Sequence, residues 1–407
     1  MWMKFSLSNR KKGTVTLDIV ARYITTGFSF INILFLVKLQ NLNDFSAFQV
    51  AYSLASIVTW ISDIGLGITL IQALASNKMQ LVKSIWSLRI AIFLLISAFS
   101  YGFAFYAVSP NFIFFFAAAN FDLFTDSNLN LRVVSTRRTL DYTVQPLKKF
   151  VQFASLILLY ISSTTVDSRM ICTVYVLPSL ALLIFDTRRF GGFTIRWELN
   201  QINKSASKWL QSGGLALVNL DNLILGYFGM HSIIVILAIT KKIYSAIAVV
   251  ATAAVPKVLF QVTKDKIIGR HIRILIAKVT LSTGILAVLA SIFHSHIFQI
   301  LLKNIPLYSA EHFMITVYLL TLPLTIMCLA LNATLLGLNR NFSAAAATYS
   351  SSVIYLSVLY ISLCYVNGGL AVSIASVTYV ILWLLIQLTF LRKELFRKSY
   401  EFGQKGS

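Results

Sequence analysis

Long apolar stretches, each about the length of a bilayer-spanning helix, constrain this 407-residue chain more than any other feature. A helix needs about 20 mostly apolar residues to cross a membrane, and outer-membrane strands need only about 9–11. The chain is therefore expected to be an all-α polytopic membrane protein. We predict twelve transmembrane helices, at residues 14–37, 45–72, 87–108, 111–130, 147–163, 169–187, 207–228, 232–254, 273–295, 311–336, 343–365 and 369–391.

The composition supports a membrane location. Hydrophobic residues make up 57% of the chain and charged residues 12%, whereas soluble domains are roughly 45–50% apolar and about 25% charged. A net charge of +21 could indicate nucleic-acid binding. Here most of the positive charge lies in loops between apolar runs, as it does in membrane proteins. We therefore expect the lipid bilayer, and no nucleic acid, as a partner.

The distribution of Lys and Arg predicts the orientation. Most of the 35 basic residues lie at the N-terminus, in alternate loops or in the C-terminal tail, and the opposite loops hold Lys38, Arg169 and Lys303. Because positive loops stay in the cytoplasm, both termini are expected there. The loops on the other side are short, which leaves no room for an extracytoplasmic catalytic domain.

A polar linker at residues 191–206 divides the predicted helices into six and six. The expected organisation is an N-terminal six-helix lobe at 1–190, a C-terminal lobe at 207–392 and a basic cytoplasmic tail at 393–407. Two such halves favour a repeat architecture with a substrate path between the repeats.

Four cations lie inside apolar stretches, where a bilayer disfavours them: Arg22, Lys241, Lys242 and Lys278. Such cations normally face the interior of the bundle or a watery cavity. The lysine pair begins about ten residues into its span, which is roughly 15 Å deep at 1.5 Å per residue. We predict that these four residues line a path for an anionic substrate.

Each of these cations also has a simpler interpretation. Arg22 lies four residues after Asp18 on the same helix face, and an ion pair would neutralise both. Asp221 of the preceding span could pair with one of the two adjacent lysines. Lys278 could extend to the membrane surface, and Arg89, at the start of a span, is expected to do so.

Besides Asp18, six acidic residues fall within or beside the predicted spans, and a carboxylate there could couple transport to a gradient of H⁺ or Na⁺. Asp221, Asp63 and Asp18 are our candidates for coupling. Asp186 is expected at the interface, and Asp126 is expected to pair with Arg132. The six are Asp63, Asp122, Asp126, Asp186, Asp221 and Glu311.

No motif for nucleotide hydrolysis, nucleophilic catalysis or metal binding appears in the chain. The three cysteines lie in apolar segments and indicate neither a disulfide framework nor a metal site. We therefore expect no cofactor and no metal. Pro178 and Pro323 interrupt the sixth and tenth predicted spans, since proline bends helices.

Two segments carry a resemblance to a known family. The first contains Asp63, Ile64, Gly65, Leu66 and Gly67. The second spans residues 209–258 and contains an Asp before a leucine-rich segment, then a Tyr-Ser helix that ends in Pro-Lys. The residues of the second segment are Asp221, Leu225, Gly226, Tyr227, Tyr244, Pro256 and Lys257.

With the twelve-helix plan, these segments resemble the O-antigen flippase (Wzx-type) family, the polysaccharide branch of the MOP superfamily that also contains the multidrug MATE exporters. The resemblance implies a transporter and not an enzyme. It would move undecaprenyl-diphosphate-linked oligosaccharides across the bacterial cytoplasmic (inner) membrane by alternating access of two six-helix lobes. It also implies a polysaccharide polymerase and chain-length machinery as partners.

Two other functions stay open at this stage. A cation-coupled multidrug exporter of the same fold would be expected to have acidic residues in its cavity, because its substrates are mostly cationic. A membrane polysaccharide polymerase or ligase commonly uses a large external loop, which the short loops here disfavour.

Overall fold

The structure is a computed structural model. Its described residues form helices joined by turns and loops, and none of them lies in a strand. Nine of their helices are long and apolar enough to cross a membrane, so the chain is an all-α, multi-span membrane protein. The described residues are 12–75, 78–107, 110–128, 132, 140–162, 166–194, 200, 209, 213–214, 216–265, 268–301, 309–338 and 340–401.

The chain folds into two compact units. Unit 1 comprises Met1–Ser212 and Leu225–Lys242, and unit 2 comprises Gly213–Ile224 and Ile243–Ser407. Both units therefore draw on residues beyond the predicted linker, and helix α11 (His231–Asp265) contributes to each. The lobe and linker boundaries given above stay a prediction.

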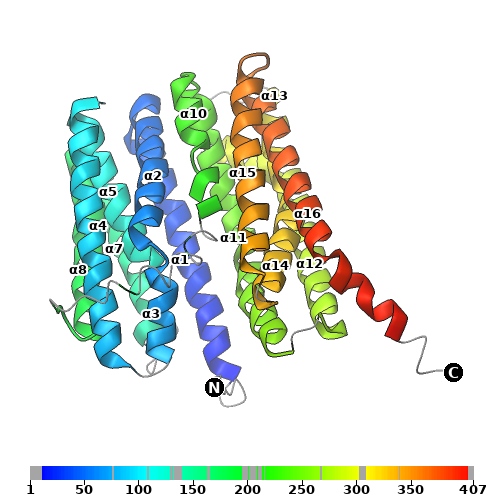
Figure 1. Ribbon diagram of the computed structural model, residues 1–407. Coiled ribbons are helices and arrows are strands. Elements are labelled where there is room, and N and C mark those ends of the chain that lie inside the picture. Colours follow the sequence, from blue (N-terminus) through cyan, green and yellow to red (C-terminus); the bar gives the residue numbers. More distant parts are fainter. Residues whose placement is uncertain are drawn as a thin grey trace. The chain divides into compact units, whose positions relative to one another are not determined.

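Unit 1 is a bundle in which α5 lies against three other helices. It packs on α2, α4 and α8, while α1 packs on α7 (Figure 1). The helices of this unit, besides the start of α11, are α1 (Lys12–Leu39), α2 (Leu42–Asp63), α3 (Leu66–Ala75), α4 (Met79–Ala107), α5 (Pro110–Ser127), α7 (Leu140–Ser162) and α8 (Ser168–Arg189). Helix α10 (Asp221–Tyr227) crosses the sequence boundary between the two units, which lies between Ile224 and Leu225. It lies within the seventh predicted span.

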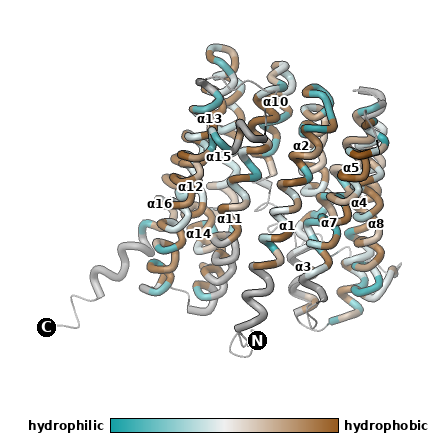
Figure 2. Tube along the Cα trace, turned by 180° about the vertical axis from the view of Figure 1, so that it is seen from behind, coloured by the Kyte–Doolittle hydropathy of each residue, from teal (hydrophilic) through white to brown (hydrophobic). Residues whose placement is uncertain are grey.

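Unit 2 is built around α16, which packs on α13, α14 and α15. Helix α12 packs on α13 and α14. These helices are α12 (Arg270–Leu301), α13 (Ser309–Leu320), α14 (Leu322–Gly337), α15 (Asn341–Leu363) and α16 (Gly368–Glu401). Hydrophobic residues predominate along the helices of both units (Figure 2). Many large apolar side chains, such as those of Leu95 and Phe99, are exposed.

The second predicted span is broken between α2 and α3 by two left-handed residues. Ile64 has φ 42° and Gly65 has φ 69°. Both angles lie in the left-handed region, which residues other than glycine rarely adopt. Immediately before the break, Asp63 accepts a long hydrogen bond of 3.4 Å from the Gly67 amide. A Cβ at Gly67 would lie 3.0 Å from the Asp63 carboxylate, so glycine lets the carboxylate approach the start of α3.

The tenth predicted span is also broken, at the position the sequence indicates. Helix α13 ends at Leu320 and α14 begins at Leu322, with Pro323 in its first turn, where proline is well tolerated. Pro178 behaves differently, because it lies inside the unbroken helix α8.

Two tryptophans of unit 1 join distant parts of the chain. The rings of Trp60, near the end of α2, and Trp209 stack with centroids 4.9 Å apart. Each indole N–H donates to the other residue's backbone carbonyl, at 3.2 Å from Trp60 and 3.0 Å from Trp209. Trp209 is therefore held against α2 by two hydrogen bonds and a ring stack.

Gly214 of unit 2 lies so close to α15 that a side chain would not fit. A Cβ there would come within 2.6 Å of the Thr348 methyl and 2.8 Å of its backbone carbon, and the Gly214 carbonyl accepts a 2.7 Å hydrogen bond from Ser352. We expect Gly214→Ala to destabilise the protein by about 1–3 kcal/mol, as overpacking does.

Thermal unfolding of the purified protein in detergent checks this expectation. Gly27→Ala is the matched control, because a Cβ at Gly27 meets nothing within 4 Å. Equal melting temperatures for the two variants would contradict the close approach at Gly214.

Candidate functional site

Unit 1 contains a cavity of about 40 Å³. A water molecule needs roughly 10–15 Å³ on this measure, so the cavity can hold water but not a phosphate group. Its described lining combines polar and aromatic side chains from α1, α2, α5, α7, α8 and the first part of α11. The lining residues are Ser29, Asn32, Ile33, Phe48, Gln49, Tyr52, Asp122, Lys149, Gln152, Tyr175 and Lys242.

Asp122 of α5 is the carboxylate in this lining. Its oxygens accept from Lys149 Nζ at 2.9 and 2.7 Å, and from Gln152 Nε2 at 2.7 Å. Lys148 Nζ lies 2.8 Å from Asp122 Oδ1. Asp122 is almost fully buried, so its charge depends on these neighbours for compensation.

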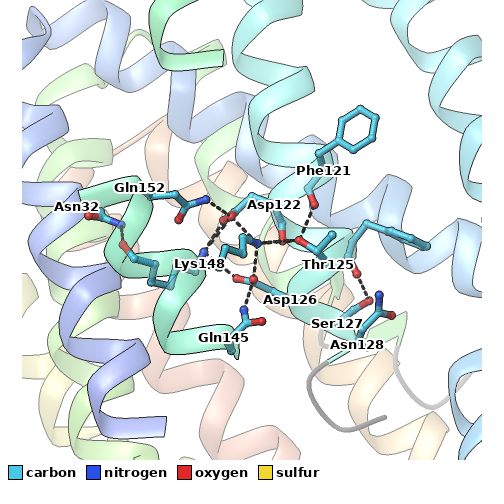
Figure 3. A network of polar contacts seen from close by, with 12 residues as sticks. Asn32, Phe121, Asp122, Thr125, Asp126, Ser127, Asn128, Gln145, Lys148 and Gln152 are labelled. Carbon is cyan, nitrogen blue, oxygen red and sulfur yellow. Dashed lines mark hydrogen bonds and ion pairs between the residues drawn. The ribbon is translucent and has the colours of Figure 1, made fainter. Parts of the chain in front are cut away.

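A second carboxylate shares the same two lysines. Asp126, one turn after Asp122, lies 2.7 Å from Lys148 Nζ and 2.9 Å from Lys149 Nζ. Gln145 Nε2 also donates to Asp126 (Figure 3). The four charged groups form a cluster of two cations and two anions, held by consecutive turns of α5 and by two adjacent residues of α7.

Lys242 brings a further positive charge to the cavity wall. It makes no ion pair or hydrogen bond with any residue that the structure describes. The lining and the cluster together hold three lysines, Lys148, Lys149 and Lys242, and two carboxylates, Asp122 and Asp126. They therefore carry an excess of one positive charge.

Three buried polar atoms beside the cavity have no hydrogen-bond partner among the described residues: Asn32 Oδ1, Gln49 Nε2 and Gln152 Oε1. The other ends of two of these amides are engaged, because Asn32 donates to the Lys149 carbonyl and Gln152 donates to Asp122. Buried polar atoms are normally hydrogen-bonded, so these three indicate a site for water or a polar ligand.

A second ion pair extends the polar network away from the cavity. Asp186 of α8 is fully buried and accepts from Arg132 at 2.8 and 2.7 Å. Arg132 also donates to Gln145 at 2.5 Å, which connects this pair to Asp126. Asn128 donates to Asp186 at 3.2 Å.

The network ends at the break between α2 and α3. Arg89 donates to Asn128, to Ser127 at 2.9 Å and to Asp63 at 2.6 Å. A continuous set of side-chain contacts thus runs through unit 1 from the end of α2 to the cavity, with equal numbers of cations and anions before Lys242 is added.

Two expectations from the sequence are wrong here. Arg89 does not extend to the membrane surface, because it is 1% exposed and paired with Asp63. Arg132 pairs with Asp186, which is buried, instead of Asp126. The physical reason is common to both, since a buried charge takes the partner that the helix packing places beside it.

The anion-path candidates are distributed over both units. Lys242 lines the cavity, whereas Arg22 and Lys241 are partly buried in unit 1 without being part of its described lining. Lys278 is exposed on α12 in unit 2. The structure thus gathers one of the four candidates at the cavity and adds Lys149.

The coupling candidates occupy three different environments. Asp63 pairs with Arg89. Asp221 is fully buried in unit 2, where it accepts from the Tyr355 hydroxyl at 3.0 Å and from the Asn222 amide at 2.8 Å. Asp18 is in α1, but its side chain lies outside the described residues.

Sequence reasoning missed Lys148 and Lys149, which lie at the very start of the fifth predicted span, 147–163. Helix α7 begins at Leu140, so both lysines lie more than one turn inside it, and both are 4% exposed. Their signal in the sequence is a polar stripe of Gln145, Lys148, Lys149 and Gln152 at helical spacing. A matching pair, Asp122 and Asp126, lies one turn apart on α5.

No protein-family model and no curated protein matches this chain. Solved structures do match it over nearly its whole length. An inward-facing multidrug resistance MATE family transporter of the MOP superfamily aligns with a TM-score of 0.67, at 12% identity, and the match covers 97% of this chain and 100% of the other.

Two further structures give similar matches. The MATE transporter VcmN of Vibrio cholerae, as a point mutant, has a TM-score of 0.59 at 15% identity, over 94% of this chain and 96% of that one. A MOP superfamily transporter from Pyrococcus furiosus, described as having a binding pocket of reverse polarity that suggests a different function, has a TM-score of 0.56 at 10% identity, over 94% and 96%. This chain therefore shares the fold of these transporter structures.

Removing a buried carboxylate of the network should cost far more stability than removing an exposed one. Asp186→Ala leaves the Arg132 guanidinium buried without its anion, and we expect it to destabilise the protein by about 3–5 kcal/mol. Denaturant or thermal unfolding in detergent measures the difference from wild type.

The matched control is Asp167→Ala. Asp167 lies 3.9 Å from Arg169 with side chains 53% and 74% exposed, so little change is expected. An Asp186→Ala protein as stable as the Asp167→Ala protein would show that the Arg132–Asp186 pair does not hold unit 1 together.

Proposed function

We propose that this protein is a flippase that moves undecaprenyl-diphosphate-linked oligosaccharide, an O-antigen or similar repeat unit, across the bacterial cytoplasmic membrane. The observation that carries the proposal is Lys242, a cation without a carboxylate partner among the described residues, on the wall of a polar cavity in unit 1. Cations inside a membrane are costly and mark the paths of anionic substrates.

The charges around the cavity favour an anion over a cation. Lys149 and Lys242 line the cavity with Asp122, and Lys148 and Asp126 complete the cluster behind them. The sum is one positive charge, which would repel the cationic substrates of a typical drug exporter and attract a diphosphate.

The uncharged lining suits the other part of the substrate. The unpartnered atoms of Asn32, Gln49 and Gln152 offer acceptors and a donor to hydroxyl groups or phosphate oxygens. Tyr52 and Tyr175 add aromatic surface beside them, on which sugar rings could pack. A site for a lipid-linked sugar diphosphate needs these three kinds of group together.

The size of the cavity implies a conformational change during transport. At about 40 Å³ it is too small for a phosphate group, so the substrate enters only when the lining helices separate. This agrees with alternating access, in which the same site faces one side of the membrane and then the other. Both termini would lie in the cytoplasm, and transport would run from the cytoplasmic to the periplasmic leaflet.

Movement against a gradient would need a coupling ion, H⁺ or Na⁺. Asp221 is our first candidate, because it is a fully buried carboxylate that accepts from a tyrosine hydroxyl. Asp63 is bound by Arg89, so it could take part only if that pair opens. Asp18 completes the candidates, and Arg22, Lys241 and Lys278 would guide the anion outside the cavity.

A cation-coupled multidrug exporter is the alternative that the fold allows, since MATE transporters share it. Within the same superfamily fold, the Pyrococcus furiosus transporter is described as having a pocket of reverse polarity. Pocket polarity therefore separates functions on this fold better than the helix arrangement does, and here the polarity favours an anion.

Replacing Lys242 should abolish most of the activity. We expect Lys242→Ala to reduce surface polysaccharide by at least about tenfold in a bacterium whose own flippase is deleted, because the cavity loses its uncompensated charge. Lys242→Arg should restore much of it. Surface glycan is measured by gel or flow cytometry at equal expression.

Arg169→Ala is the matched control, since this exposed arginine lies away from the cavity lining. Full surface polysaccharide in the Lys242→Ala strain would refute the anion path.

A second experiment separates the flippase from the drug exporter. Expression of the wild-type protein should restore surface glycan in the deletion strain and leave its resistance to cationic dyes unchanged. Increased dye resistance without surface glycan would favour the exporter instead.

A further inference from the structure

Asp122 occupies the position on Lys149 that a substrate anion would need. It lines the cavity, and both of its oxygens accept from Lys149, at 2.9 and 2.7 Å. An incoming diphosphate would have to compete with this carboxylate for the same ammonium group.

The cluster is arranged so that Asp122 can leave it. Lys148 and Lys149 each contact Asp126 as well, at 2.7 and 2.9 Å, and Asp126 is not among the described residues that line the cavity. When Asp122 moves away, both lysines therefore keep one carboxylate partner, and Gln152 keeps the free acceptor that Asp122 does not use.

The charge balance identifies the ligand that fits. Without Asp122, the three lysines Lys148, Lys149 and Lys242 face Asp126 alone, which leaves two positive charges. A diphosphate that joins a lipid to a sugar carries about two negative charges near pH 7, one on each phosphate. With Asp122 in place, the site carries an excess of one positive charge. That single charge would not balance the two negative charges of a diphosphate.

We propose that Asp122 is a resident counter-ion that a lipid-linked diphosphate displaces from Lys149 when it binds between Lys149 and Lys242. This inference rests on the proposed function. In the empty carrier Asp122 pairs with Lys148 and Lys149, so only Lys242 is left without an ion-pair partner among the described residues when the cavity closes. In the loaded carrier the diphosphate replaces it.

The proposal predicts opposite effects on binding and on turnover. Asp122→Asn removes the competitor, so the diphosphate binds more tightly, but the empty carrier can no longer neutralise its lysines and closes poorly. The probe is farnesyl diphosphate, titrated into the purified full-length protein in detergent and followed by calorimetry. We expect Asp122→Asn to lower its Kd by about tenfold or more, while the same variant restores less surface polysaccharide than wild type.

Asp126→Asn is the matched control. It removes one negative charge that contacts the same two lysines, at a position outside the cavity lining. We expect its Kd to change by less than about threefold. Equal tightening in both variants would overturn the proposal, since the effect would then be one of net charge and not of displacement.

A second measurement uses the wild-type protein, in case Asp122→Asn fails to fold. A hydrophobic carbodiimide labels carboxyl groups that have lost their ion pairs, and mass spectrometry locates the label. Saturating farnesyl diphosphate should increase labelling of Asp122 and leave that of Asp186 unchanged. Labelling of Asp122 that stays constant or falls overturns the proposal.

These experiments separate the inference from the function beneath it. Binding by wild type that Lys242→Ala weakens, with no tightening in Asp122→Asn, overturns the counter-ion proposal and leaves the flippase standing. If neither wild type nor Asp122→Asn binds the diphosphate, both proposals fall.

Discussion

The cost of leaving a charge unpaired inside a membrane protein determines how unit 1 is built. A lone buried ion costs several kcal/mol or more, so the helices that carry charges must meet at positions where the charges compensate one another. Arg89, Arg132, Lys148 and Lys149 each have a carboxylate at 2.6 to 2.8 Å. This requirement fixes how α4, α5, α7 and α8 sit in the bundle, and it makes a cation without such a partner informative.

The transport proposal follows from that single exception within the described part of the cavity wall. Lys242 stands beside a compensated cluster, on a cavity where one polar atom in each of three amide side chains has no hydrogen-bond partner among the described residues. A protein that otherwise pairs its buried charges so thoroughly gains nothing in stability from this arrangement. Sites that break the local rules of stability are where function is expected, and the chemistry of this one suits an anion that also carries hydroxyl groups.

Much of the fold could be predicted from the sequence, but much of the site could not. Runs of about 20 apolar residues identify spans directly, and a proline near the middle of a run located the break before α14. Charge partners depend on which helices become neighbours, and that is a property of packing. Arg132 lies six residues after Asp126, yet it pairs with Asp186, 54 positions away in the chain. The lysines of α7 were overlooked because two adjacent cations just before an apolar run resemble the end of a loop.

The reciprocal contact between Trp60 and Trp209 gives the molecule a built-in optical reporter. Two indoles stacked at 4.9 Å with an interplanar angle of 12° couple their electronic transitions, which produces a distinctive near-ultraviolet dichroism band. Separation of the rings would remove that band and alter the fluorescence of both. Movement of Trp209 away from α2 could therefore be followed in real time, in the native protein and without any attached dye.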